Sequence, residues 1–518
     1  MINYHRLLWQ AFFLSSATLF SLTACMRVGP DFHPQNPPKT LKYTTLPLPK
    51  KTISTPQLEN AGKSQHFVFD QDLKGDWWRI FHSSQLNQLI VQGLANNQDL
   101  AAAKAALREA NDTLYAQAGG LLLPQVNMSG IAGATQGSGL AYGVNTAPST
   151  FNIYNVNFQA TYLLDIWGAS RRQVEAYAAQ ADYQRYEMLG VYITLTTNIV
   201  TTSVTIASLQ EQIKATKNLI SEQQAVLTIT KKQLAAGGVS VENVLTQQTL
   251  LAQTQATLPP LQKSLSEEQH ALAVLEGRQT SDNSLLKLSL NKIVLPQTLP
   301  VSLPSNMITQ RPDIQASEAL LHAASAQVGV ATANLLPQLT LSAASGWLST
   351  TTTAFFSAAN QTWNYGLGLA QPLFHGGQLI MQRKAAIEAL NQARAQYEQT
   401  VLTAFKNVAD ALRAIQYDAD ELNKQTYAEK SAYETFYLTK KQYKVGGQNY
   451  LSVLQAEEKY QQIVLSTVKA QAARYADTAA LYQSLGGGWW HNNAINNYDI
   501  NKLKFGSQFK LPQPGNSQ

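Results

Sequence analysis

Residues 122–130 read LLPQVNMSG, and residues 335–343 read LLPQLTLSA. A second pair of stretches, QLAAGGVSVENVL at 233–245 and QYKVGGQNYLSVL at 442–454, keeps its two glycines and its last Val-Leu in register. Both pairs are offset by about 210 residues, which is too long for a solenoid repeat and indicates two copies of one larger unit. We therefore expect an internal two-fold repeat, with a first copy at 76–295 and a second at 296–490.

Each LLPQ motif opens a segment in which polar and apolar residues alternate. We expect one β-hairpin at about 122–165 and another at about 336–374. In the clearest strand, one face carries Tyr154, Val156, Phe158, Ala160, Tyr162 and Leu164, and the other carries Asn155, Asn157, Gln159 and Thr161. Strands of about ten residues with one apolar face are typical of a transmembrane β-barrel. A soluble sandwich with one wet face is the alternative on periodicity alone.

Very long helices are expected after each hairpin. The segments 168–234 and 376–443 contain no proline and favour helix throughout, so each helix would run roughly 100 Å. The glycine pairs Gly237-Gly238 and Gly446-Gly447 should end these helices, after which a helix of about 40 residues returns. Ser240 and Asn449 are the expected N-caps of the returning helices.

Four strands per chain cannot close a barrel in lipid, because open edges leave backbone groups unpaired. Two chains would give a narrow barrel of about eight strands, filled by its own side chains, whereas three would give about twelve and room for a lumen. The polar strand faces suit water better than a packed interior. We therefore expect an α+β membrane protein: a trimeric 12-stranded transmembrane β-barrel, continued by a long α-helical barrel.

The N-terminal region contains the only cysteine, Cys25. Residues 1–24 have the layout of a secretory signal whose apolar segment is too short and interrupted to be a good membrane span. The sequence LTAC at 22–25 resembles the lipobox of bacterial lipoproteins, in which the cysteine is acylated and becomes the mature N-terminus. An ordinary signal peptide with a chance cysteine is the alternative. We expect a covalent lipid on Cys25, a lipid-attached extended tether at 25–75 and a polar tail at 491–518.

The overall composition argues against several other classes of protein. Charged residues make up 14% of the chain, against about 25% in ordinary soluble domains, which favours extensive contact with lipid or other subunits. After Cys25, no stretch reaches the roughly 18–20 apolar residues of a spanning helix, so strands are the expected membrane element. The net charge of +6 is not gathered into a basic face with aromatics, so we expect no nucleic-acid partner.

An enzyme finds little support in the sequence. The eight histidines are scattered, and no metal-binding pair, phosphate-cradling glycine loop or nucleophile elbow occurs. We expect no catalytic residues, no metal site and no cofactor beyond the covalent lipid. A lipoprotein scaffold with long helices that braces the envelope without conducting is the remaining alternative, although it would not need matched pairs of alternating strands.

Several motifs resemble the TolC-like outer-membrane efflux proteins, most closely the lipid-anchored branch typified by OprM and the NodT-type lipoproteins. They are, in chain order, CMRVGPDFHP (25–34), WWRIFHSSQLNQLI (77–90), LLPQ twice, YLLDIWGASRR (162–172), RPDIQASEALLHAA (311–324), QPLFHGGQL (371–379), YEQTVLTAFKNVADAL (397–412) and LYQSLGGGWW (481–490). The resemblance implies a homotrimeric exit duct in the outer membrane of a Gram-negative bacterium, lipid-anchored on the periplasmic side, with helices extending into the periplasm. It also implies a periplasmic membrane-fusion adaptor and an inner-membrane pump, of RND type, as partners. Drugs or other small toxic solutes would be the cargo.

The resemblance also places a gate at the periplasmic tip, marked by Gly237, Gly238, Gly446 and Gly447. In relatives, acidic residues a few positions beyond these glycines commonly ring the closed aperture. The matching positions here hold Asn243, Ser452 and Gln455, with Gln448 where an arginine can stand, and Glu457 lies nearby. Glu242 is one residue away from its matching position, about 100° around the helix, and a solvated helix-start carboxylate is its alternative role. We expect the tip to close through neutral hydrogen bonds, which would make the duct less cation-selective than its relatives.

Aromatic residues flank the outer loops of the two expected hairpins. They are Tyr142, Phe151, Trp347, Phe355, Phe356 and Trp363. We expect a membrane-interface girdle, with simple loop packing as the alternative. Trp77, Trp78, Trp489 and Trp490 lie far from the strands, and we expect them to pack a collar around the helical cylinder.

Overall fold

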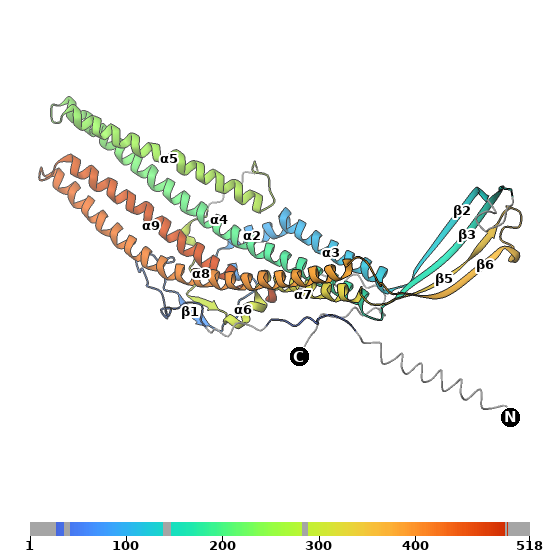
Figure 1. Cartoon of the computed structure of the whole chain (residues 1–518). Helices are drawn as coiled ribbons and strands as arrows, with labels where there is room; N and C mark the ends of the chain where they lie inside the picture. Colours follow the sequence, from blue (N-terminus) through green and yellow to red (C-terminus); the bar gives the residue numbers. More distant parts are fainter. Residues whose placement is uncertain (1–26, 36–41, 138–146, 282–287, 493–494, 496–518) are drawn as a thin grey trace.

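Two long helical hairpins lie at one end of the molecule and a four-stranded sheet lies at the other (Figure 1). The computed structural model describes residues 27–35, 42–137, 147–281, 288–492 and 495. The first helical hairpin consists of α4 (Ala169–Ala235) and α5 (Val241–Leu275), and the second of α8 (Gln378–Lys444) and α9 (Tyr450–Ser484). Helices α4 and α8 have 67 residues each, which corresponds to roughly 100 Å.

The sheet is antiparallel and has the order β2-β3-β5-β6. Its strands are β2 (Gln125–Gly137), β3 (Ser149–Leu164), β5 (Gln338–Ser349) and β6 (Gln361–Ala370). These strands lie within the two segments that alternate in sequence. Strands β2 and β6 form the edges of the sheet within one chain.

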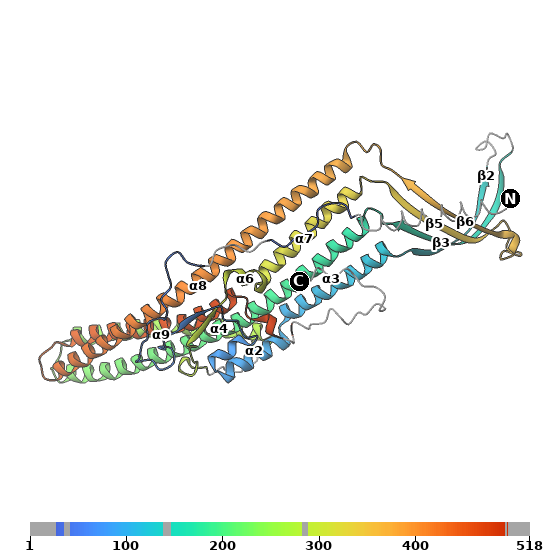
Figure 2. The same ribbon diagram turned by 90° about the horizontal axis from the view of Figure 1, so that it is seen from below.

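Each strand of the sheet is joined end to end with a helix. Helix α3 (Gln98–Leu122) leads into β2, β3 leads into α4, α7 (Pro312–Ala333) leads into β5, and β6 leads into α8. Helix α3 packs on α4, α4 on α7, and α7 on α8, and Figure 2 shows these four helices side by side. The helices therefore follow the same order as the strands, and the chain forms one continuous layer from the sheet into the helical region.

The register places most of the apolar residues of the four strands on one face, because residues directly opposite each other in an antiparallel sheet share a face. Tyr162 pairs with Leu341, which pairs with Leu367, and Phe158 pairs with Met128 and with Ser345. The opposite face carries rows such as Gln159, Ala344 and Asn364. Large apolar side chains on the first face, among them Leu367 and Trp363, are exposed in the single chain.

The middle of the molecule holds the largest hydrophobic core and the smaller elements. These are α2 (Ser84–Asn96), α6 (Pro304–Gln310), the short 3-10 helices η1 (Trp77–Phe81), η3 (Leu290–Lys292) and η5 (Trp489–His491), and a parallel pair formed by β1 (His66–Phe69) and β4 (Thr298–Val301). The 3-10 helix η4 (Ala358–Asn360) lies instead between β5 and β6. The β1–β4 pair joins the segment before the first repeat to the start of the second.

Two expectations about this middle region need correction. Trp77, Trp78 and Trp489 are buried inside the core of the chain rather than packed around the outside of a cylinder, and Trp77 stacks on Tyr482 with ring centroids 5.4 Å apart. The segment expected to be a tether is extended but is bound to the body of the protein. The backbone carbonyl of Lys63 in this segment accepts a hydrogen bond of 3.2 Å from Arg474 of α9. Strand β1, which is also part of the segment, pairs with β4.

Helix α4 contains a window that is long and apolar enough to cross a membrane, although no such stretch was expected after Cys25. Most of this window is buried inside the protein, where α4 packs against α5, α7, α9 and α3. Its apolar residues are therefore accounted for by core packing.

Candidate functional site

The two helical tips have the same backbone geometry. Gly237 and Gly446 have φ angles of +76° and +77°, in the left-handed region that favours glycine. The N–H groups of Gly238 and Gly447 donate to the carbonyls of Gln233 and Gln442 at 2.8 and 2.9 Å. These bonds satisfy carbonyls at the ends of α4 and α8, so each glycine pair ends its helix by the same physical means. Both tips lie at the end of the molecule remote from the sheet (Figure 1).

Ser240 and Asn449 cap the returning helices, as the sequence indicated. The Ser240 side chain accepts from the N–H of Asn243 at 3.4 Å, and Asn449 Oδ1 accepts from the N–H of Ser452 at 2.8 Å. The Ser452 hydroxyl also donates to Asn449 Oδ1 at 2.8 Å. The backbones of Asn243 and Ser452, two expected gate residues, thus take part in helix capping, and the Ser452 hydroxyl is held by its cap.

A groove with a volume of about 570 Å³ lies between α5 and α9 near the tips. Glu242 and Gln455, which come from different repeats, both line it, together with Leu245, Leu451 and Glu458. Asn243 and Ser452 do not line this groove. Gln448 is exposed in the turn before α9. The structure therefore brings together only Glu242 and Gln455 among the expected tip residues.

A hydrogen-bonded chain joins the two repeats beside this groove. The Tyr450 hydroxyl, at the start of α9, donates to Gln247 Oε1 of α5 at 2.7 Å. Gln247 Nε2 in turn donates to the backbone carbonyl of Gln223 in α4 at 3.3 Å. Burial raises the pKa of Tyr450, so its hydroxyl keeps its proton and acts as a donor. Sequence reasoning missed this contact, because nothing local to either residue indicates a partner in the other repeat.

Glu457 of α9 is a buried carboxyl close to the tips. Its side chain is 3% exposed. Its pKa is raised to about 7, chiefly by burial and also by the charge of Glu222 on α4, while Lys440 on α8 lowers it. This acid therefore gains or loses a proton near neutral pH, in a position where three long helices meet.

The aromatic residues at the outer end of the sheet divide into two groups. Trp347 packs edge-on against Phe356 with ring centroids 5.3 Å apart, and the ring centroids of Phe356 and Phe355 are 4.8 Å apart. These three residues therefore pack around the loop between β5 and β6. Trp363 stacks on Tyr365 at 5.9 Å, and both project from the apolar face of β6 and are exposed. Phe151 is partly exposed on β3. Tyr142 lies outside the described residues.

The residues after Cys25 are bound at the junction between sheet and helices. Cys25 itself lies outside the described residues. The N–H of Val28 donates to the carbonyl of Trp167 at 3.1 Å, and Asp31 forms an ion pair of 2.5 Å with the buried Arg172 at the start of α4. Phe32 stacks on His322 of α7 at 4.4 Å. The start of the tether is therefore bound where β3 becomes α4.

A family model described as outer membrane efflux protein matches residues 89–278 and 303–487. The chain belongs to this family. Each matched segment contains one pair of long strands and one long helical hairpin. As a member of the outer membrane efflux protein family, the chain is TolC-like, as its motifs indicated, and the outer membrane, efflux and transport assignments are confirmed.

Similar proteins support the same assignment. The pyoverdine export outer membrane protein OpmQ of Pseudomonas putida is 30% identical over 418 residues, covering 80% of this chain and 88% of OpmQ. The probable outer membrane lipoprotein SilC of Salmonella typhimurium is 27% identical over 487 residues, covering 92% and 98%. Among solved structures, the outer-membrane channel OprN superimposes with a TM-score of 0.79 at 26% identity, covering 89% of this chain and 99% of OprN.

Proposed function

We propose that three copies of the chain form an exit duct of a tripartite efflux system. The duct would pass drugs or other small toxic solutes from a periplasmic adaptor and an inner-membrane pump of the RND type to the outside. The observation that carries this proposal is the sheet, in which one face holds most of the apolar side chains of its strands and each strand is joined to a layer of long helices. A barrel with a lipid-facing outside and a water-filled inside requires strands that have one apolar and one polar face.

Closure of the barrel supports the stoichiometry. Among the described residues of one chain, the outer backbone edges of β2 and β6 have no neighbouring strand. Unpaired backbone groups in lipid cost several kcal/mol each, so β6 of one copy must pair with β2 of the next. Three copies supply twelve strands, which is wide enough for an aqueous lumen. The three-fold rotation that relates the copies would also bring α8 of one copy beside α3 of the next and close the helical layer.

Acylation of Cys25 fits the position of the tether. Arg27 follows Cys25 by two residues, and a side chain on Gly168, between β3 and α4, would approach the Cα of Arg27 to 3.1 Å. This junction is the level at which a barrel would leave the membrane. We infer a covalent lipid on Cys25 in the periplasmic leaflet of the outer membrane of a Gram-negative bacterium, with the helices extending into the periplasm.

The tips are the proposed gate and docking point for the adaptor. The groove between α5 and α9 offers leucines flanked by Glu242, Gln455 and Glu458, a surface suited to another helical hairpin. Asn243, Gln448 and Ser452 are neutral, and we propose that the closed tip is held by hydrogen bonds rather than by a ring of carboxylates. Substitution of Asn243 that leaves ion selectivity unchanged would argue against this gate.

The test is conductance of the purified trimer in planar bilayers, combined with drug susceptibility of a strain that lacks its own outer-membrane duct. The proposal predicts stable single-channel currents and restored resistance when the partner adaptor and pump are present. A trimer that inserts but never conducts would instead support the scaffold. Conductance without restored resistance would contradict the efflux role.

A further inference from the structure

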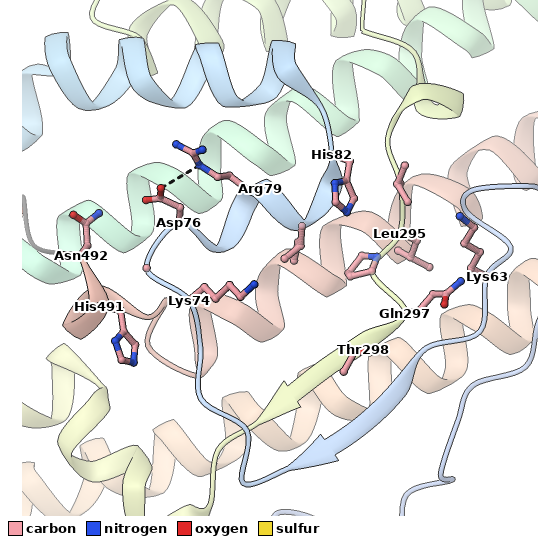
Figure 3. Close-up of a pocket in the computed structure, with 14 residues that line it drawn as sticks. Lys63, Lys74, Asp76, Arg79, His82, Leu295, Gln297, Thr298, His491 and Asn492 are labelled. Atoms are coloured by element: carbon pink, nitrogen blue, oxygen red, sulfur yellow. Dashed lines mark ion pairs between the residues drawn. The ribbon is translucent and has the colours of Figure 1, made fainter.

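A pocket of about 1040 Å³ lies at the middle of the molecule, away from both the sheet and the tips. Segments far apart in the sequence form it: residues 74–82 around η1, residues 294–298 leading into β4, residues 491–492 at the end of η5, and Lys63 before β1. Figure 3 shows side chains of these segments around the hollow. None of its residues takes part in the proposed gate or in the membrane sheet.

Positive charge dominates the lining of this pocket. Three cations, Lys63, Lys74 and Arg79, line it together with His82 and His491, and Asp76 is the one carboxylate among the described lining residues. Asp76 is paired with Arg79 at 3.1 Å, and His491 is paired with Asp72 at 2.6 Å outside the lining. Within the described part of the chain, the side chains of Lys63 and Lys74 form no ion pair, and Figure 3 shows them at separate sides of the hollow.

The backbone that presents these cations is fixed by close packing. A side chain on Gly75 would approach the backbone nitrogen of Asn492 to 3.0 Å. The backbone segments that carry Lys74 and His491 are therefore in contact. Gly488 has a φ of +71° and packs against the carbonyl of Lys74. The indole of Trp490 donates to Asp72 Oδ1 at 3.0 Å, and that of Trp489 donates to the carbonyl of Gln310 at 2.8 Å. These two tryptophans thus pre-organise one wall of the pocket.

The charge and size of the pocket indicate the class of its ligand. A pocket lined by several cations and one paired carboxylate favours a negatively charged ligand. Charge complementarity of this kind gives a binding site specificity and a fast association rate. Drug-sized ligands occupy pockets of roughly 300–1,000 Å³, so this pocket is larger than a single carboxylate or phosphate needs. The chain's own C-terminal segment is a poor electrostatic match, because residues 493–518 contain three lysines and one aspartate.

We propose that this pocket binds a carboxylate-rich peptide segment of a partner protein, with Lys63 and Lys74 pairing with two of its acidic side chains. This contact is separate from adaptor docking at the tips. It would anchor a partner to the middle of the duct at a fixed distance from the membrane.

The experiment measures binding of a fluorescent hexaglutamate peptide to the full-length trimer in detergent, with a hexaglutamine peptide of the same length as the neutral control. We expect saturable binding of hexaglutamate alone, weakened as salt rises from 50 to 300 mM because the pairs are partly exposed. The double variant Lys63→Gln/Lys74→Gln should lose at least about tenfold in affinity. The matched variant Lys430→Gln/Lys459→Gln, which removes the same charge from exposed positions on α8 and α9, should bind as the unmodified chain does.

Three results would overturn the proposal. If both double variants weakened hexaglutamate binding equally, the peptide would be attracted by the general surface charge and not by this pocket. No saturable binding of hexaglutamate at low salt would exclude the site. Binding of citrate that depends on Lys63 and Lys74, in the absence of peptide binding, would assign the pocket to a free polycarboxylate instead of a protein partner.

Discussion

The hydroxyl of Tyr450 lies 2.7 Å from Oε1 of Gln247 and donates a hydrogen bond to it. Tyr450 begins α9 of the second repeat, and Gln247 lies in the second turn of α5 of the first. The bond therefore ties the two helical hairpins together close to their tips. Any widening of the tip that separates α5 from α9 must break it.

Replacing Tyr450 with Phe removes this hydrogen bond and keeps the ring. A net hydrogen bond of about 1 kcal/mol corresponds to about a fivefold change in an equilibrium, so we expect the open fraction of the channel to rise about fivefold. Single-channel recording measures this fraction. Tyr443→Phe is the control, because the Tyr443 ring contacts Tyr450 at 5.3 Å but is not part of the hydrogen-bonded chain. An unchanged open fraction in Tyr450→Phe would show that this contact does not restrain the tip.

Glu457 should make the tip sensitive to pH. Its pKa is raised from 4.5 to about 7 in the folded protein, first by burial and then by Glu222. Its contribution to stability is therefore fully present below pH 4.5 and is lost as the pH rises through about 7, because ionisation favours an opened state in which the carboxylate meets water. We expect amide hydrogen exchange of residues 450–460, corrected for intrinsic rates, to be faster at pH 8 than at pH 5.

Glu457→Gln should abolish this pH dependence, since the amide cannot ionise. Glu458→Gln is the matched control, because Glu458 is its exposed neighbour. Among the described residues, Lys440 is the cation that lowers the pKa of Glu457. Lys440→Gln should therefore enlarge the pH effect. The same pH dependence in Glu457→Gln and in the unmodified chain would assign it to another group.

The two faces of the sheet should respond differently to charge. Leu341 lies on the apolar face, opposite Tyr162 and Leu367, and Ser342 lies on the other face, opposite Thr161 and Gly366. A lysine on the lipid face costs up to about 2–4 kcal/mol per copy, so Leu341→Lys should reduce the amount of assembled trimer in the outer membrane. Ser342→Lys should assemble normally and lower cation conductance. The reverse pattern would mean that the apolar face lines the lumen.

Local sequence signals predicted the repeating elements well. The strands at Gln125–Gly137 and Gln338–Ser349, the left-handed turns at Gly237 and Gly446, and the N-cap at Asn449 all depend on residues within a few positions of each other. Alternation, φ preference and capping act at that range, so one sequence is enough to see them.

Contacts between distant segments could not be predicted in the same way. The burial of Glu457 and the partner of Tyr450 depend on how two repeats pack, and the parallel pairing of β1 with β4 joins segments more than 200 residues apart. Helix α5 also continues through Pro259 and Pro260, where local preference favours a break and the rest of the helix overrides it. The tryptophans expected on a collar are in the core because their partners, such as Tyr482, come from another part of the chain.

The first residues of the tether should depend on close packing against a glycine of α7. A side chain on Gly329 would approach the carbonyl of Val28 to 3.0 Å and Cγ of Arg172 to 2.9 Å. We expect Gly329→Ala to displace residues 27–35, at a cost of about 1–3 kcal/mol, and to expose them to limited proteolysis. Gly190→Ala on α4 is the control, because nothing lies within 4 Å of its added carbon. Equal resistance of both variants to protease would contradict this packing.

Cross-linking of the two edge strands tests the shared barrel most directly. In a chain whose only native cysteine is Cys25, cysteines replace Asn127 on β2 and Gly368 on β6, both near the helical end of the sheet, and outer membranes are treated with a short thiol cross-linker. Pairing of β6 with β2 of the next copy predicts a ladder of monomer, dimer and trimer that ends at the trimer, whereas either cysteine alone should stop at the dimer or give no product. A ladder that ends at the dimer, continues past the trimer, or is absent from assembled protein would contradict a barrel built from three copies.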